Sequence, residues 1–358
     1  MKSPSLLLLL VAAVTMTFGI STSAAQGQGN CSGEINGDGF IDGVDLAVVL
    51  GPWGSWGSCP EVITSVTPTE SVGAASIEVT DAMGTATASG AFTSIAIIVP
   101  AWATLLEASP DPTVVTDANL RAAIVASGFA WRIRDNSSNI EMLLVPAGTF
   151  TMGCSPGDTD CYRDESPAHQ VTLTNAFYMG KTEVTQAQWQ AKMGSNPSSY
   201  SGFSDSPSRP VEQVSWNMIQ GFNTATGLRL PTEAEWEFAC RAGTTTARYG
   251  VLDDIAWYYS NSFGTTGGTR PVATKLPNAL GLYDTLGNVQ EWCQDWYGGT
   301  YSSGSVTNPT GPATGSYRLL RGGNWNYKSK NCRGSERNNA STPDFIISDI
   351  GFRVARNP

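Results

Sequence analysis

Histidine is almost absent from this sequence, which has a single one, His169, among its 358 residues. Zinc and non-haem iron sites that rely on imidazole need two or three histidines, so sites of that kind are excluded. A Ser-His-Asp triad would have to use His169 as its base. His169 lies in a strand-like run over residues 169–174, and we expect it to have a structural role at the surface.

Positive charge is also scarce, because 21 lysines and arginines are set against 31 aspartates and glutamates, giving a net charge of −10. Nucleic acids and anionic membranes are bound through clusters of basic side chains. A chain this acidic argues against both as partners.

Long apolar runs are missing after the first residues of the chain. The run over residues 6–20 follows Lys2 and is followed by small residues at positions 23–25, which is the pattern of a secretory signal peptide. The run is too short to span a membrane, and no later segment reaches spanning length. We predict a signal peptide over residues 1–25, no membrane span after its removal, and a secreted protein, extracellular or periplasmic. Export would permit disulfides among the seven cysteines.

Residues 34–45 have the spacing of a twelve-residue calcium loop, with Gly39 at the sixth position, where such a loop turns sharply. The pattern resembles one dockerin repeat. We predict a dockerin-like calcium-binding module over residues 26–60, with its ends bridged by Cys31 and Cys59. A dockerin that docks cohesin has two repeats, so a cohesin-type partner is the alternative to a structural cap. The predicted calcium ligands are Glu34, Asn36, Asp38, the carbonyl of Phe40, Asp42 and Asp45.

Residues 61–138 are rich in Ser, Thr, Ala, Gly and Val and carry no motif that points to chemistry. Alternation over residues 76–80 allows a strand, and residues 117–125 suit a helix that leads into the next domain. We predict that residues 61–138 form a linker or a poorly defined region.

One helix is specified more clearly than any other part of the sequence. Pro231 suits its entrance, where the missing N–H is no loss. Thr232 can cap the helix, and Glu235, three residues later, completes a capping box. Gly243 would end it. A second helix is predicted over residues 182–192.

Six motifs follow one another along the last part of the chain, and together they resemble the formylglycine-generating enzyme (sulfatase-modifying factor) family. The resemblance covers residues 139–358, which we predict to be one domain. It implies a mixed α+β fold with little regular secondary structure, related to C-type lectin-like domains. The motifs occupy residues 142–153, 181–189, 227–243, 281–292, 321–325 and 350–353.

The resemblance implies an active site at residues 322–332. Active members of the family bind copper(I) through two cysteine thiolates, five positions apart, just after a Gly-Gly-Ser turn. Here the serine position is Asn324, the first thiolate position is Tyr327 and the second is Cys332. Copper(I) prefers soft sulfur ligands, and a phenol cannot replace a thiolate. We therefore expect neither copper binding nor formylglycine generation. A copper-dependent oxidase that converts a substrate cysteine in sulfatases to formylglycine is the alternative.

The cysteines have a second interpretation. The resemblance implies a disulfide between Cys240 and Cys332, and Cys154 and Cys161 could close a loop, which would leave Cys293 unpaired. Seven cysteines allow other pairings. If Cys332 were free beside a second thiol such as Cys293, a rearranged copper site would remain possible.

The resemblance also implies a structural calcium site at the side chains of Asp284 and Glu291 and the carbonyls of Gly287 and Val289. Calcium is bound by hard oxygens of these kinds. The alternative is that the two carboxylates only cap the turn and hydrogen-bond to it.

The last forty residues suggest a binding face. Six positions where relatives carry asparagine hold other residues, which resembles the variable region of retroelement-diversified lectin-like proteins; ordinary drift in surface loops is the alternative. The function we expect is non-catalytic binding of a peptide, protein or glycan around residues 324–337. The oxidase and an assembly component connected through residues 34–45 are the alternatives. The six positions are Tyr327, Phe345, Ile346, Ile347, Ser348 and Asp349.

Overall fold

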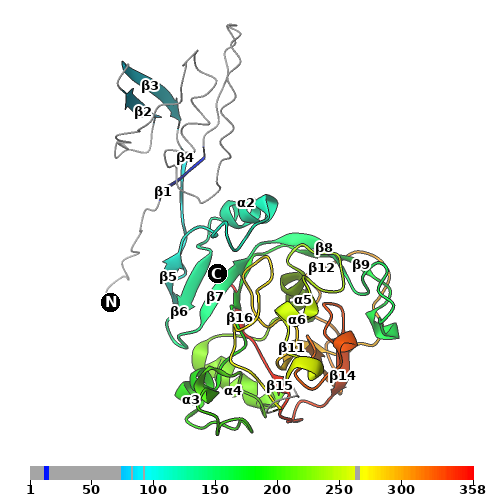
Figure 1. The fold of residues 1–358 in the computed structure, drawn as a ribbon. Helices are drawn as coiled ribbons and strands as arrows, with labels where there is room; N and C mark the ends of the chain where they lie inside the picture. Colours follow the sequence, from blue (N-terminus) through cyan, green and yellow to red (C-terminus); the bar gives the residue numbers. More distant parts are fainter. Residues whose placement is uncertain (1–11, 16–73, 82–83, 92, 263–266) are drawn as a thin grey trace. The chain divides into compact units, whose positions relative to one another are not determined.

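The structure is a computed structural model of the whole chain (Figure 1). The predicted calcium loop over residues 34–45, with Cys31 and Cys59, lies outside the residues that the structure describes, and so does most of the predicted signal peptide. The described residues are 12–15, 74–81, 84–91, 93–262 and 267–358.

The chain divides into two units, one of residues 1–98 with 109–112 and one of residues 99–108 with 113–358. In the first unit, the described residues form two antiparallel strand pairs. No helix among the described residues is long and apolar enough to cross a membrane. The pairs are β1 (Ala12–Thr15) with β4 (Thr93–Ala96), and β2 (Ala74–Asp81) with β3 (Gly84–Ala91).

The second unit contains a five-stranded antiparallel sheet in the order β16-β10-β7-β6-β5. Its central strand, β7, is almost wholly buried. The strands are β5 (Ala103–Glu107), β6 (Arg132–Asp135), β7 (Glu141–Val145), β10 (Phe177–Gly180) and β16 (Ala355–Arg356).

Two strands of this sheet, β5 and β6, fall inside the region that we expected to be a linker. Ile133 of β6 and the adjacent Trp131 are buried, and the backbone of β6 pairs with both β5 and β7. This part of the expected linker therefore belongs to the folded domain. The helix expected over residues 117–125 forms as α2 (Ala118–Ala126), and Asp117 caps it.

Two smaller sheets complete the second unit, in the orders β14-β13-β11-β15 and β12-β9-β8. β11 pairs antiparallel with β13 and parallel with β15. The strands are β8 (Gly148–Met152), β9 (His169–Leu173), β11 (Gln290–Trp296), β12 (Val306–Thr307), β13 (Arg318–Arg321), β14 (Arg337–Ser341) and β15 (Ile350–Gly351).

The helices of the described chain are short, with four to eleven residues each. Together with the small sheets they give the mixed α+β class that the sequence predicted. Besides α2, the helices are α3 (Gln186–Met193), α4 (Trp216–Thr226), α5 (Glu233–Arg241), α6 (Leu252–Ile255) and α7 (Tyr259–Ser262). The 3₁₀ turns are η2 (Arg163–Glu165), η3 (Ser206–Ser208) and η4 (Ser329–Asn331).

The start of α5 follows the sequence prediction. Thr232 is its N-cap, and the Thr232 hydroxyl and Glu235 carboxylate form both bonds of a capping box. The left-handed residue at its end is Ala242, at φ 46°, one position before the expected Gly243. α3 starts at Gln186, later than residue 182, because Thr185 forms its own capping box there.

α5 packs against β8, β11 and β13, and a buried ion pair joins it to β13. Glu237 of α5 and Arg321 of β13 are both fully buried and bonded to each other. Arg321 also donates hydrogen bonds to the carbonyls of Gly334 and Ser335, at 2.9 and 2.8 Å, and of Glu336, at 2.5 Å. One guanidinium therefore fixes the loop that precedes β14.

Replacing Arg321 with methionine should destabilise the domain strongly. The Arg321→Met variant leaves the Glu237 charge buried without its partner, and removing one partner of a buried ion pair costs about 3–5 kcal/mol. The free energy of unfolding in urea measures this loss. Arg134→Ala is the control, because Arg134 is 42% exposed where it pairs with Glu141, and such pairs contribute at most about 1 kcal/mol. Equal losses in both variants would contradict the assignment.

Candidate functional site

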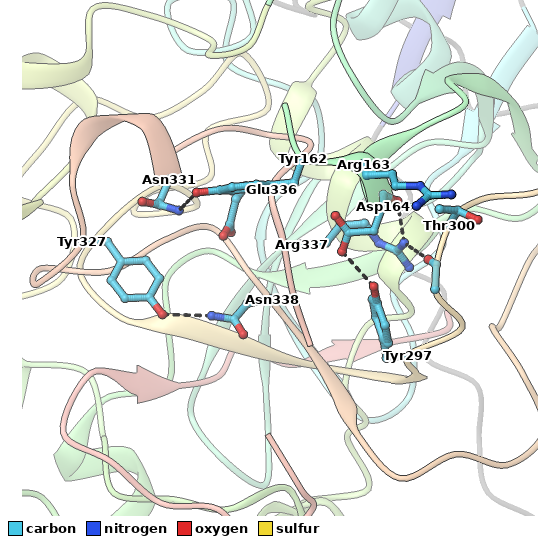
Figure 2. A pocket seen from close by; sticks show the side chains of 11 residues that line it. Tyr162, Arg163, Asp164, Tyr297, Thr300, Tyr327, Asn331, Glu336, Arg337 and Asn338 are labelled. Carbon is cyan, nitrogen blue, oxygen red and sulfur yellow. Dashed lines mark hydrogen bonds between the residues drawn. The ribbon is translucent and has the colours of Figure 1, made fainter. Parts of the chain in front are cut away.

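A pocket with a volume of about 580 Å³ opens between three segments that lie far apart in sequence. One segment is Tyr162 with η2, the second follows β11, and the third runs from Tyr327 into β14. Figure 2 shows Tyr327 and Asn338 on one side, with Asp164, Tyr297 and Arg337 on the other. The lining residues are Tyr162, Arg163, Asp164, Tyr297, Gly299, Thr300, Tyr327, Asn331, Glu336, Arg337 and Asn338.

A disulfide and a buried arginine position the first of these segments. Cys154 and Cys161 are joined in a disulfide, as their spacing allowed. The Arg333 guanidinium donates to both oxygens of Glu165, at 2.6 Å each, and to Asp158 Oδ2 inside the disulfide loop, at 3.1 Å. The loop that carries Arg333 is thereby bound to the loop that carries Tyr162.

Arg337, in the third segment, binds the other two segments and the start of α5. Its guanidinium donates to both oxygens of Glu233, at 2.6 and 3.0 Å. It also donates to the carbonyl of Asp164, at 2.8 Å, and to that of Gly299, at 2.5 Å. The start of α5, η2 and the segment after β11 are therefore all held by one side chain.

Three tyrosine hydroxyls face the pocket with defined partners. The Tyr327 hydroxyl accepts a hydrogen bond from Asn338 Nδ2, at 2.9 Å, and the Tyr162 hydroxyl accepts one from Asn331 Nδ2, at 3.3 Å. The Tyr297 hydroxyl donates to Asp164 Oδ2, at 3.0 Å (Figure 2). Burial raises the pKa of Tyr327 to about 12, so this phenol stays protonated.

Glu336 is the buried acid of the pocket wall. It is 3% exposed, and its Oε2 has no hydrogen-bond partner among the described residues. Burial raises the pKa of the carboxyl from 4.5 to about 7, against the opposing effect of Arg321 and Arg333. Near neutral pH this side chain is therefore divided between its neutral and ionised forms.

The residues at the expected copper positions do not form a thiolate pair. Tyr327 lines the pocket, whereas Cys332 is fully buried, and burial raises the pKa of its thiol to about 12. Asn324, also buried, accepts a hydrogen bond from the backbone N–H of Asn326, at 3.0 Å. A phenol and a buried thiol are a poor donor set for copper(I).

The expected Cys240–Cys332 disulfide is wrong in this structure. Cys240, Cys293 and Cys332 are all buried free thiols. The Cys240 sulfur lies on α5 within 4.0 Å of the Thr285 carbonyl oxygen, while Cys332 follows η4 near the pocket. The family resemblance implied the pairing, but the position of each sulfur depends on loop packing that the sequence does not express.

The two carboxylates expected to bind calcium in the 281–292 motif, Asp284 and Glu291, have different hydrogen-bond partners. Asp284 accepts from the backbone N–H of Ala273, at 2.7 Å, and its buried Oδ1 has no partner among the described residues. Glu291 is occupied, because Arg353 donates to both of its oxygens, at 2.7 Å each, and Trp236 Nε1 to one, at 2.6 Å.

Asp284 thus fits a cation, whereas the charge of Glu291 is neutralised by Arg353. The described residues contain no group of three histidine, cysteine or acidic side chains placed to hold a metal. Calcium at Asp284, Glu291 and the carbonyls of Gly287 and Val289 stays a prediction.

Sequence reasoning missed the half of the pocket that comes from residues 162–164 and 297–300. Neither segment carries a motif that points to chemistry, so no sequence signal marked these residues. His169, half-buried, packs on Tyr301 with ring centroids 4.8 Å apart.

Comparison with known proteins identifies the class to which this fold and pocket belong. The chain matches the family described as "Sulfatase-modifying factor enzyme 1-like domain" over residues 130–358. It therefore belongs to the sulfatase-modifying factor family.

Relatives of several kinds share this domain. The chain is 36% identical over 242 residues to serine/threonine-protein kinase pkn1 of Chlamydia pneumoniae, covering 61% of this chain and only 38% of that protein. It is 30% identical over 301 residues to the formylglycine-generating enzyme of Streptomyces coelicolor, covering 66% of this chain and 94% of that enzyme. The solved structure of Treponema denticola variable protein 1 is 33% identical, with a TM-score of 0.55, over 61% of this chain and 95% of that one.

The three free thiols of the described residues should be inert in the native protein. Cys240, Cys293 and Cys332 are buried, and burial raises the pKa of each thiol, so we expect alkylation only after unfolding. Iodoacetamide labelling without reductant, before and after guanidinium, with mass-spectrometric mapping, measures this. Cys154 and Cys161 serve as the control, since they should stay linked until reduced. A peptide that joins Cys240 to Cys332 would contradict the structure.

Removing the Glu336 carboxyl should change how stability depends on pH. A carboxyl whose pKa is raised by folding contributes stability below its unfolded pKa, and this stability is lost as the pH rises through the folded value, about 7. Glu336→Gln cannot ionise, so from about pH 4.5 to about pH 8 it should gain on the order of 3 kcal/mol relative to wild type. Urea unfolding of both proteins at both pH values measures this. If the difference in free energy of unfolding between Glu336→Gln and wild type is the same at both pH values, the assignment is refuted.

Proposed function

We propose that the domain is a non-catalytic binding domain and that its pocket holds a saccharide. The observation that carries this proposal is the chemistry of the lining. Hydroxyl, amide and charged groups and three tyrosine rings surround the pocket, and no aliphatic side chain is among its lining residues. Tyrosine combines a ring surface with a polar end, which suits a hydroxyl-bearing ring better than an apolar peptide side chain.

Loss of the thiolate pair supports a binding role over oxidation. The position of the first thiolate is Tyr327, a protonated phenol whose hydroxyl is bound by Asn338. The second, Cys332, is a buried thiol. The rival function is that of the Streptomyces coelicolor relative, named a formylglycine-generating enzyme, acting on a substrate cysteine with copper.

A variable binding face is the second candidate. Of the six positions with altered residues, Phe345, Ile346 and Ile347 are exposed, and Tyr327 lines the pocket, whereas Asp349 is buried. The similarity to Treponema denticola variable protein 1 favours this candidate. Nucleotide differences confined to these codons among close copies of the gene would support it.

Calcium in the 34–45 loop as a structural cap, and secretion, complete the proposal for the rest of the chain, with a cohesin-type partner as the alternative to the cap. The calcium loop rests on its six oxygen-bearing positions. Calcium titration of the full mature chain, followed by calorimetry, tests the loop, and Asp38→Ala with Asp42→Ala should remove that binding.

Filling the pocket should abolish saccharide binding. Thr300 lines the pocket and is exposed, so Thr300→Trp blocks the cavity without disturbing the core. We expect binding on a glycan array to fall at least about tenfold, the loss expected when contacts of roughly 1.4 kcal/mol are removed. Thr224→Trp, at an exposed position of α4, is the matched control.

The wild-type protein used on the glycan array should leave a cysteine-containing sulfatase peptide unoxidised in the presence of copper(I) and oxygen. Formylglycine formed above the no-protein background would refute the non-catalytic proposal. Selective binding to a peptide array, lost in Thr300→Trp, would replace the saccharide with a peptide ligand.

A further inference from the structure

The pocket has two ends with different chemistry. Its lining cations, Arg163 and Arg337, lie at one end, beside Asp164 (Figure 2). No cationic side chain among the described lining residues lies at the other end, toward which the hydroxyl of Tyr162 points. We call this other end the tyrosine subsite. It is lined by Tyr162, Tyr327, Asn331, Glu336 and Asn338.

The polar groups of the tyrosine subsite face one shared space. The Tyr327 hydroxyl accepts a hydrogen bond from Asn338, and the Tyr162 hydroxyl accepts one from Asn331. Figure 2 shows the Glu336 carboxyl between these two pairs. Burial, and after it the charge of Glu336, raise the pKa of Tyr327, which agrees with a carboxyl close to that phenol. These groups are therefore placed to contact a single sugar ring.

The subsite offers both hydrogen-bond donors and an acceptor. Each tyrosine hydroxyl that accepts a hydrogen bond from an asparagine keeps its own hydrogen to donate. The acceptor is the Glu336 carboxyl, which is 3% exposed and whose Oε2 has no hydrogen-bond partner among the described residues. A buried polar oxygen without a partner is costly, so a ligand that donates to this carboxyl would be stabilised in the pocket.

A sugar hydroxyl matches this combination because it donates and accepts at once. The carboxylate or sulfate of an acidic sugar, presented here, only accepts, so it would leave Glu336 without a donor and would be repelled by its ionised form. The ammonium of an amino sugar only donates, so it would leave the hydroxyl hydrogens of Tyr162 and Tyr327 without an acceptor. A neutral sugar satisfies both kinds of group.

The cations near Glu336 do not favour an anion in the subsite. Arg321 and Arg333 act on the Glu336 carboxyl, but each is buried and paired with another glutamate. Lys330, whose ammonium lies 5.5 Å from the centre of the Tyr162 ring, is exposed to solvent, where salt screens its attraction for an anion. An anion would thus meet Glu336 without a buried, unpaired cation to offset it.

We propose that the tyrosine subsite binds one neutral sugar ring, whose hydroxyls donate to Glu336 and accept from the hydroxyls of Tyr162 and Tyr327. This inference rests on the proposed saccharide-binding function and names its ligand class. The tyrosine rings supply a surface for the ring of the sugar. Glu336 is then the residue that determines specificity, because it rewards a donor and repels an acidic sugar.

The test measures binding of matched neutral and charged sugars to the full chain by ligand-detected NMR titration. The neutral probes are the methyl glycosides of glucose, galactose and mannose. The charged probes are the corresponding uronates, with a carboxylate at C6, and the corresponding 2-amino sugars. We expect at least one neutral glycoside to bind about tenfold or more tightly than both of its charged counterparts. If no neutral glycoside shows this preference, the inference is wrong.

Two substitutions assign the contacts. Glu336→Gln removes the carboxylate acceptor, so it should weaken binding of the neutral probe about tenfold and narrow the preference over the uronate. Tyr327→Phe removes one donor and should weaken binding of the neutral probe about two- to tenfold. The matched controls are Asp254→Asn on α6 and Tyr317→Phe, both at exposed positions outside the pocket, and they should have no effect.

Failure of this inference can be separated from failure of the proposed function. A neutral probe that is lost in Thr300→Trp, but binds Glu336→Gln and Tyr327→Phe as it binds wild type, would overturn the subsite and keep the pocket as the saccharide site. Binding that all three variants leave intact would overturn the pocket itself as the site. If no saccharide binds in the titrations or on the glycan array, the proposed function fails and this inference fails with it.

Discussion

A carboxylate without access to water is stable only where a cation and hydrogen-bond donors surround it, and Glu237 is in that position at the centre of the domain. It accepts from the backbone N–H of Gly153, at 2.9 Å, from Arg241 Nε, at 2.8 Å, and from Arg321. The end of β8, the last turn of α5 and the end of β13 are therefore oriented by one side chain. Because Arg321 also binds the carbonyls before β14, the position of the pocket wall depends on this buried charge.

Around that centre the domain has the scaffold of its family, and its residues at the expected copper positions are a phenol and a buried thiol. Tyr327 replaces a soft ligand with a phenol that is held by Asn338 and kept neutral by burial. The cavity remains, with hydroxyls and amides where a metal site would need sulfur. Its polarity limits what it can hold, and the saccharide that we propose would meet hydroxyl, amide and charged groups in its lining.

The sequence predicted most of the fold and half of the pocket. The capping box of α5 could be predicted because Thr232 and Glu235 act on neighbours three residues away, and the 322–332 motif identified Tyr327. β5 and β6 were missed because four- and five-residue strands that carry Arg132, Arg134 and Asp135 show little apolar alternation. The state of the cysteines depends on where loops pack, which is a property of the whole chain.

Three arginines near the pocket, Arg321, Arg337 and Arg248, donate to main-chain oxygens of the surrounding loops. Arg321 contacts the carbonyls of residues 334–336, Arg337 those of Asp164 and Gly299, and Arg248 those of residues 329 and 332. A carbonyl is present whatever side chain its residue carries. Substitution of exposed side chains such as Lys328 and Lys330 would leave these hydrogen bonds in place, so the specificity of the site can change at little cost to folding.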